Sequence, residues 1–427
     1  MFHLKQVRAK ALSAALAAAL LTSCAAPPAE DEVTLSFFQF KPEAVKEFAG
    51  LIDEFEAANP GIRVLQNNVP DPDTAIRTLL VKNKTPDVLT LNGNASFGLL
   101  ARACVFADLS QEPAARDVLP AVQDILNANG RCSGSEINGL PMANNASGVL
   151  YNPELFAKYG VSVPRTWDEL IAAAETFKAN GVAPFYMTLK DAWTTSPALV
   201  NLAAQLQPEG FFDRLTAAGA DRNNSPVSFS KDYQEVADKL LQLFHYAQPG
   251  AAGVDYATGN KAFADGKSAM YLNGSFAVPA IRAANPDARI ASFPYPVTNN
   301  PGNVTVVSGV DVVLAMGRDT PHRAEAQKFI NFLMSKDVID KYAKNQSALA
   351  PIRSAAPQQD TALRGLASYF TSGKVDGYMD HRLPPSIPLV NITQQFVLDG
   401  DKSRYLNTLD NEWFKVAARM PNRGDQQ

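Results

Sequence analysis

The strongest constraint on the fold is the alternation of strand-like and helix-like patterns over residues 33–91. The first segment alternates apolar and polar side chains as a strand does, and the next places apolar side chains at helical spacing until Asn59-Pro60-Gly61 ends the helix. The predicted strands are 33–37, 62–65 and 87–91, and the predicted helices are 45–55 and 75–81. This order predicts an α/β lobe built on a largely parallel sheet.

The chain is too long for one compact core, since 427 residues predict two domains. A second stretch of the same kind begins near Gly148, and within it Thr166 and Glu169 have the spacing of a capping box at a helix N-terminus. That helix ends at Asn180-Gly181. Trp167 is expected to pack beside the helix cap rather than to contact a ligand.

The N-terminal segment predicts export from the cytoplasm. Lys5, Arg8 and Lys10 precede an uncharged run of Ala and Leu that is too short to span a bilayer. Leu21-Thr22-Ser23-Cys24 resembles the bacterial lipobox, so residues 1–23 are expected to be a lipoprotein signal peptide and Cys24 the site of lipidation. The alternative is ordinary secretion with an incidental cysteine. Residues 24–32, with two prolines and three acidic residues, are expected to form a flexible tether.

The two remaining cysteines are expected to pair. Outside the cytoplasm, an even number of cysteines favours a disulfide, here between Cys104 and Cys132. Such a bond closes a loop of about 30 residues and would stabilise the fold by roughly 3 kcal/mol. The alternative is two unpaired buried thiols.

Charge and histidine content exclude several functions. The formal charge is -4, and it becomes -7 when residues 1–23 leave with three cationic and no anionic side chains, which argues against a nucleic-acid partner. The mature chain keeps only His245, His322 and His381, so a His-rich metal site is not expected. No cofactor is expected.

Six segments match, in order, the motifs of a known family. They are Phe55–Val64, Thr85–Leu89, Gly148–Asn152, Pro164–Leu170, Phe263–Tyr271 and Phe329–Ser335. On these motifs, which span most of residues 33–352, the chain resembles the family 1 extracellular solute-binding proteins. These are the sugar-binding components of ABC importers and are related to maltose-binding protein. After about Pro357 the chain matches only as a helical tail.

The resemblance implies a two-lobed periplasmic-binding-protein-like fold, in which two α/β lobes are joined by a three-crossing hinge. By this analogy, lobe one comprises residues 33–143 and 306–347, and lobe two comprises residues 144–305 and 348–427. Crossings near residues 144–145, 304–307 and 348–352 would form the hinge. The resemblance also implies a monomeric, non-enzymatic lipoprotein on the extracytoplasmic face of the cell membrane. Its partners would be a carbohydrate, expected to be an oligosaccharide held in the cleft between the lobes, and the permease subunits of an ABC transporter.

A sugar presents hydroxyls at its edge and apolar C–H faces, so its site needs aromatic rings together with polar side chains. In α/β lobes these residues follow the carboxyl ends of strands. Trp193 is the principal candidate for stacking, and Arg353 is the weakest because it could equally lock the hinge. The candidate ligand-binding residues are Phe38, Gln39, Phe40, Asn92, Asn94, Asn144, Asn145, Lys190, Asp191, Trp193, Asn273, Gly274, Ser275, Ser308, Gly309, Asp311 and Arg353.

Two alternatives stay open at the level of sequence. The first is a membrane-anchored hydrolase or glycosidase; the G-x-S-x-G and H-E-x-x-H motifs are absent, but a glycosidase needs only two suitably placed carboxylates. The second is the same binding fold with another solute, such as a polyamine, a peptide or a metal chelate. A cation site usually contains a cluster of acids, whereas the candidate residues include only Asp191 and Asp311, which favours carbohydrate.

The lipobox predicts the behaviour of a Cys24→Ala variant. Without an acylated cysteine, the protein should leave the membrane fraction or fail to be processed, because its attachment depends on the lipid. Immunoblots of membrane and soluble fractions measure this. Unchanged retention on the membrane would show that the anchor lies elsewhere.

Overall fold

The structure is a computed structural model that describes residues 32–68, 72–82 and 84–419. The expected signal peptide and Cys24 lie outside the described residues. Among the helices of the described part, none combines the length and the apolar character needed to cross a membrane.

One mixed sheet of nine strands forms the centre of the molecule, in the order β2-β1-β3-β8-β4-β6-β5, with β7 paired to β4 and β9 to β8. Strands β1, β2 and β3 are mutually parallel, as predicted, whereas β8 pairs antiparallel to β3 and β4, and β4 pairs antiparallel to β6. The strands are β1 (Val33–Gln39), β2 (Ile62–Asn68), β3 (Val88–Leu91), β4 (Leu140–Tyr151), β5 (Ala183–Phe185), β6 (Ser268–Gly274), β7 (Ala291–Phe293), β8 (Val306–Met316) and β9 (Val375–Gly377).

The sequence signals mark both ends of α6, whereas α1 ends and α2 begins three residues beyond the predicted ranges. In α6 the Thr166 side chain accepts a hydrogen bond from the Glu169 backbone at 3.2 Å, while the Glu169 carboxylate accepts from the Arg165 backbone. The helices are α1 (Val45–Ala58), α2 (Pro72–Val81), α3 (Ala95–Arg102), α4 (Pro120–Asn129), α5 (Pro153–Lys158), α6 (Trp167–Ala179), α7 (Ser196–Leu206), α8 (Phe211–Ala217), α9 (Phe229–Asp232), α10 (Gln234–Phe244), α11 (Tyr256–Ala264), α12 (Val278–Ala284), α13 (Arg323–Leu333), α14 (Lys336–Asn345), α15 (Thr361–Thr371), α16 (Leu389–Asp399) and α17 (Lys402–Ala417).

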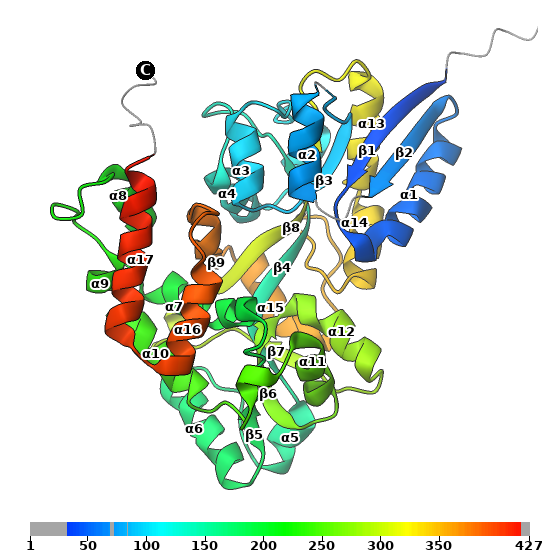
Figure 1. Cartoon of the computed structure of the whole chain (residues 1–427). Helices are drawn as coiled ribbons and strands as arrows, with labels where there is room; N and C mark the ends of the chain where they lie inside the picture. Colours follow the sequence, from blue (N-terminus) through cyan, green and yellow to red (C-terminus); the bar gives the residue numbers. More distant parts are fainter. Residues whose placement is uncertain (1–31, 69–71, 83, 420–427) are drawn as a thin grey trace, which may run out of the picture.

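The two long strands β4 and β8 run through both halves of the molecule (Figure 1). Helices α1–α4, α13 and α14 surround one end of this strand pair, and α5, α6, α11 and α12 surround the other. The chain passes between the halves a third time near Leu349, whose backbone exchanges hydrogen bonds with that of Asn144 at 2.8 and 2.9 Å. The exact residue limits of the two lobes stay a prediction.

Cys104 and Cys132 form the expected disulfide. Cys104 follows α3 and Cys132 follows α4, so the bond ties the ends of two neighbouring helices. The Arg102 side chain adds a hydrogen bond to the carbonyl oxygen of Asn129, the last residue of α4. The disulfide therefore anchors the end of α4.

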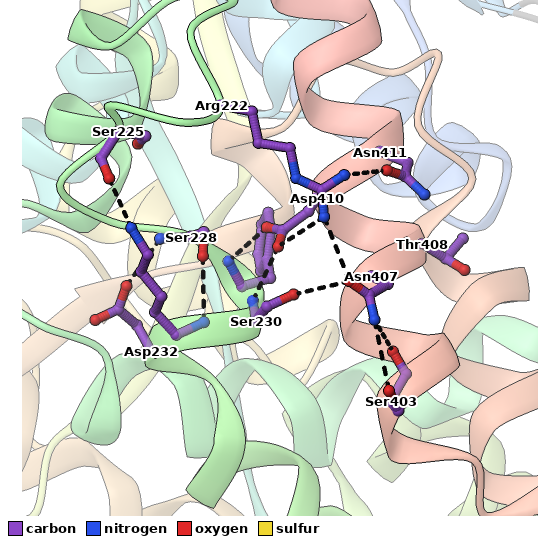
Figure 2. A network of polar contacts seen from close by, with 12 residues as sticks. Arg222, Ser225, Ser228, Ser230, Asp232, Ser403, Asn407, Thr408, Asp410 and Asn411 are labelled. Carbon is purple, nitrogen blue, oxygen red and sulfur yellow. Dashed lines mark hydrogen bonds and ion pairs between the residues drawn. The ribbon is translucent and has the colours of Figure 1, made fainter.

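The C-terminal helix α17 is held to the rest of the chain by a buried carboxylate (Figure 2). Asp410 is 1% exposed and accepts hydrogen bonds from the backbone N–H of Phe229 at 2.7 Å and of Ser230 at 3.2 Å. These two amides open α9, where a negative charge is stabilised by the helix dipole. Arg222 lies 3.9 Å from the same carboxylate. Residues more than 150 apart in sequence thus share one polar network.

The Asp410 network predicts a stability effect. Asp410→Ala would leave the Phe229 and Ser230 amides without their buried acceptor and should lower the free energy of unfolding by about 2–3 kcal/mol. Asn411→Ala, on the exposed side of α17, removes one contact with Arg222 and should stay within about 0.5 kcal/mol. Urea denaturation measures both, and equal effects would contradict the assigned role of Asp410.

Candidate functional site

The polar centre of the candidate site lies on β4 and β8. Asn144 donates from Nδ2 to the Ser308 Oγ at 3.0 Å, and Ser308 donates from Oγ to the carbonyl oxygen of Asn145 at 2.8 Å. Gly309 pairs with Asn145 across the two strands. The structure therefore brings together four of the residues selected from sequence. Asn144, Asn145, Ser308 and Gly309 are called the hinge group below.

Tyr378, which was not selected from sequence, closes one side of the hinge group. Its hydroxyl donates to the Asn145 Oδ1 at 3.2 Å. A Cβ at Gly309 would lie 2.6 Å from the Tyr378 ring, so the ring can sit here only because residue 309 has no side chain. Burial raises the pKa of Tyr378, and the charges of Asp380 and Asp311 raise it further. The phenol therefore remains a neutral hydrogen-bond donor at pH 7.

Asp311 has a charged partner in the structure. Its carboxylate forms an ion pair with Lys41, and the two side chains are only 16% and 14% exposed. The adjacent Gln39 donates from Nε2 to the Lys41 carbonyl oxygen at 2.6 Å and accepts from the Asn68 Nδ2 at 2.6 Å. These contacts fix the end of β1 against β8, and a ligand hydroxyl would have to share Asp311 with Lys41.

The other candidates at the ends of β1 and β3 differ in how much of each side chain remains free to contact a ligand. Phe38 is buried in the core. The Asn94 side chain caps α3 by accepting hydrogen bonds from two backbone amides, at 2.9 and 3.2 Å, so its oxygen already has donors. Phe40 and Asn92 are half-buried and retain accessible surface for a ligand.

Trp193 lies in the turn η3 (Ala192–Thr195) at the edge of an aromatic cluster. Its ring meets that of Tyr256 edge-on at 4.8 Å between centroids and that of Phe276 at 6.2 Å. Trp193 is 39% exposed, whereas Trp167 and Trp413 are buried. An indole kept at the surface beside two other rings offers a flat apolar face to a ligand. Trp193, Tyr256 and Phe276 are called the aromatic cluster below.

The polar residues beside the aromatic cluster have structural contacts of their own. Asp191 accepts a hydrogen bond from the Tyr256 backbone at 2.7 Å, which positions the start of α11. Lys190 is exposed and lies 3.5 Å from Asp255. Trp193 is therefore the exposed aromatic residue of this loop, although the Lys190 side chain is more exposed.

Of the last candidates, Ser275 lies next to the hinge group and Arg353 does not. The Ser275 Oγ accepts from the Ala146 backbone at 3.0 Å, one residue beyond Asn145, while Asn273 and Gly274 are buried in β6. Arg353 is not brought to this group, because its guanidinium donates to the carbonyl oxygen of Arg116 on the exposed surface.

A pocket of about 420 Å³ opens next to the hinge group. One wall is α4, and the other consists of α7, α8 and residues 375–382, so elements from both halves of the chain line it. Its volume lies within the range of small-molecule sites. The polar lining residues are Asp124, Asn129, Gln207, Asp376, Tyr378, His381 and Arg382.

The sequence offered one signal for this pocket. Tyr378-Met-Asp-His-Arg382 places an aromatic ring, an imidazole and two charges in one short run, but the region had matched only as a helical tail. The pairing of β9 with β8, across more than 60 residues, is what carries the run to the hinge group.

His381 lines this pocket with an imidazole whose Nδ1 is buried. Burial lowers its pKa, although Asp380 and a hydrogen bond to the Gly93 backbone act in the opposite direction. The buried Nδ1 has no hydrogen-bond partner among the described residues. Over residues 32–68, 72–82 and 84–419 there is no group of three or more His, Cys, Asp or Glu side chains suited to a metal ion.

Comparison with known families gives one match over most of the chain. The model of the bacterial extracellular solute-binding protein family matches residues 41–339. Among characterised relatives, the multiple sugar-binding protein of Streptococcus mutans is 27% identical over 362 residues, which cover 83% of this chain and 84% of the relative. The melibiose/raffinose/stachyose-binding protein MelE of Bacillus subtilis is 22% identical, with coverage of 79% and 78%.

Solved structures show the same fold. The apo form of RafE from Streptococcus pneumoniae superposes with a TM-score of 0.76 at 24% identity, covering 91% of this chain and 99% of RafE. RafE in complex with raffinose superposes with a TM-score of 0.73 at 25% identity, covering 90% of this chain and all of that one.

The contact between Gly309 and Tyr378 predicts a coupled effect on stability. Gly309→Ala should cost about 1–3 kcal/mol, because the added methyl group overlaps the Tyr378 ring. The same change in a Tyr378→Ala background should cost less than about 1 kcal/mol, since the ring is gone. Gly50→Ala is the control: nothing lies within 4 Å of its Cβ position in α1, so it should be neutral or stabilising. Chemical denaturation of the double-mutant cycle tests this, and equal costs in both backgrounds would refute the coupling.

Proposed function

Because this chain belongs to the family of bacterial extracellular solute-binding proteins, we propose that it captures a carbohydrate between its two lobes and delivers it to the permease of an ABC transporter. The exposed indole of Trp193 carries the proposal, since a stacking platform beside hydrogen-bonding groups is what a sugar ring requires. The names of the Streptococcus mutans and Bacillus subtilis relatives, both sugar-binding proteins, support it.

The geometry suggests how capture would work. A sugar ring would stack on Trp193, and its hydroxyls would reach the half-buried Asn145 of the hinge group and the half-buried Asn92. Strands β4 and β8 are continuous through both halves, so small backbone rotations near Asn144 and Gly309 would change the angle between the lobes. A ligand that touches both lobes binds the closed arrangement more tightly and shifts the population toward it.

Attachment to the membrane completes the proposal. Acylation of Cys24 would hold the protein on the extracytoplasmic face of the cell membrane, and residues 24–32 would let the lobes reach the permease. The family consists of binding proteins, which favours this function over the glycosidase alternative.

Trp193→Ala should weaken binding of the cognate sugar by about 2 kcal/mol or more, close to thirtyfold, and leave the fold unchanged. The cognate sugar would first be found by a thermal-shift screen, and calorimetry would then measure the affinities.

Trp167→Ala is the matched control. The Trp167 ring is buried, donates to Gln242 at 3.3 Å and lies under the Lys239 ammonium at 4.2 Å, so its loss should lower stability by about 3–5 kcal/mol with little effect on affinity. If Trp167→Ala abolishes binding in a folded protein while Trp193→Ala changes nothing, the site has been placed wrongly.

A further inference from the structure

The third passage of the chain between the two halves is contacted by a charged side chain from α12. Arg282 lies on α12, in the half opposite to that of α14 (Figure 1). Its guanidinium donates from Nη1 to the Ser347 Oγ at 3.5 Å. Ser347 follows α14 and precedes Leu349, whose backbone pairs with that of Asn144. Arg282 therefore holds the crossing from the half that the crossing enters.

The same guanidinium forms a two-point ion pair with Asp360. Nη1 donates to Oδ2 and Nη2 to Oδ1, each at 2.6 Å, a geometry that the single ammonium of a lysine cannot reproduce. The Asp360 Oδ1 also accepts from the Ala362 backbone at 3.0 Å and so caps α15. Burial raises the pKa of Asp360, but the hydrogen bonds from Arg282 and Ala362 lower it more, so the carboxylate is ionised at pH 7.

The backbone at the start of this crossing has a conformation that needs support. Ser347 is buried and has a φ of 49°, in the left-handed region that residues with a side chain adopt uncommonly and that surrounding contacts must maintain. Gln358 adds a second contact, since its side chain accepts from the Asp360 backbone at 2.9 Å and donates to the Ala348 carbonyl oxygen at 3.4 Å. Two side chains thus tie Asp360 to residues 347–348.

The three crossings differ in how the backbone holds them. The crossings in β4 and β8 belong to one long ladder, whereas the third pairs with the sheet through the isolated bridge between Leu349 and Asn144. The position of the third crossing therefore depends more on side-chain contacts, and the ion pair between Arg282 and Asp360 is a charged contact of this kind.

We propose that Arg282 is a positioning residue for ligand capture: its ion pair with Asp360 holds the third crossing in the geometry from which the two halves close on a ligand. The proposal rests on the proposed function and gives a role in it to a residue outside the candidate site. Without the ion pair, the crossing would sample other conformations and the binding-competent fraction of the protein would fall. The apparent affinity falls by the same factor, through slower association.

The test uses variants that remove the ion pair with little other change. Arg282→Gln removes the cation, and Asp360→Asn removes the anion but keeps the side-chain oxygen that caps α15. Their combination and the conservative Arg282→Lys complete the set. Arg289→Gln is the matched control, because it breaks the exposed ion pair with Glu154 in the same half.

Two measurements are made on the full chain. Hydrogen exchange without ligand reports on residues 346–352. Stopped-flow kinetics then give association and dissociation rates for the sugar that produces the largest thermal shift in a panel of melibiose, raffinose and stachyose.

Both single variants should raise exchange at residues 346–352 about tenfold or more, while exchange in β4, in β8 and in the control stays unchanged. Association should slow about fivefold or more, with dissociation within about twofold of the wild type. The double variant should be no worse than either single variant, because both remove one interaction, and Arg282→Lys should recover part of the rate.

Unchanged exchange at residues 346–352, or a uniform rise over the whole chain, would overturn the positioning role. Additive losses in the double variant, or a loss of affinity that arises only from faster dissociation, would overturn it as well. If the wild type binds no sugar of the panel, the proposed function loses its support, while the exchange measurement still decides whether the ion pair holds the crossing.

Discussion

The pairing of β4 with β8 is the constraint on which the rest of the structure depends. These two strands stay in register from Leu140 opposite Leu314 to Ser147 opposite Val307, with irregular pairing near Ala143. On one side they pair with β3 and on the other with β6, so one continuous sheet runs through both halves. Because backbone polar groups must stay paired when buried, any relative motion of the halves would have to keep this ladder paired. The hinge group lies on this ladder, in the middle of the sheet.

Much of the fold follows from local sequence signals. The alternating pattern of residues 33–37, the Asn59-Pro60-Gly61 stop and the Thr166 cap each predict an element that the structure contains. The Cys104–Cys132 pair could be predicted from the expected compartment and the even number of remaining cysteines. The antiparallel pairing of β8 with β3 and β4 could not be predicted from the sequence, because the partner of a strand is set by long-range packing and not by its own residues. For the same reason the short strand β9 was not predicted.

The residues of the candidate site were harder to predict from the sequence than the fold was. The rule that binding residues follow strands selects loops correctly, yet it cannot tell which polar side chains the fold already uses. Asn94 serves as a helix cap, and Asp191 accepts from the backbone of α11. Trp193 could be recognised as a candidate from its position, but its exposure had to come from the structure. Tyr378 and His381 reach the site only through the β8–β9 pairing, so no local pattern assigns them to it.

Hydrogen exchange with and without a bound sugar tests the central claim, capture between two lobes, most directly. The account predicts that saturating sugar slows exchange on both sides of the hinge group, in α4 and in the segments around Trp193 and Tyr378, since the closed state suppresses local opening of both walls. Protection confined to one lobe, or none at all while calorimetry reports binding, would contradict capture between the lobes.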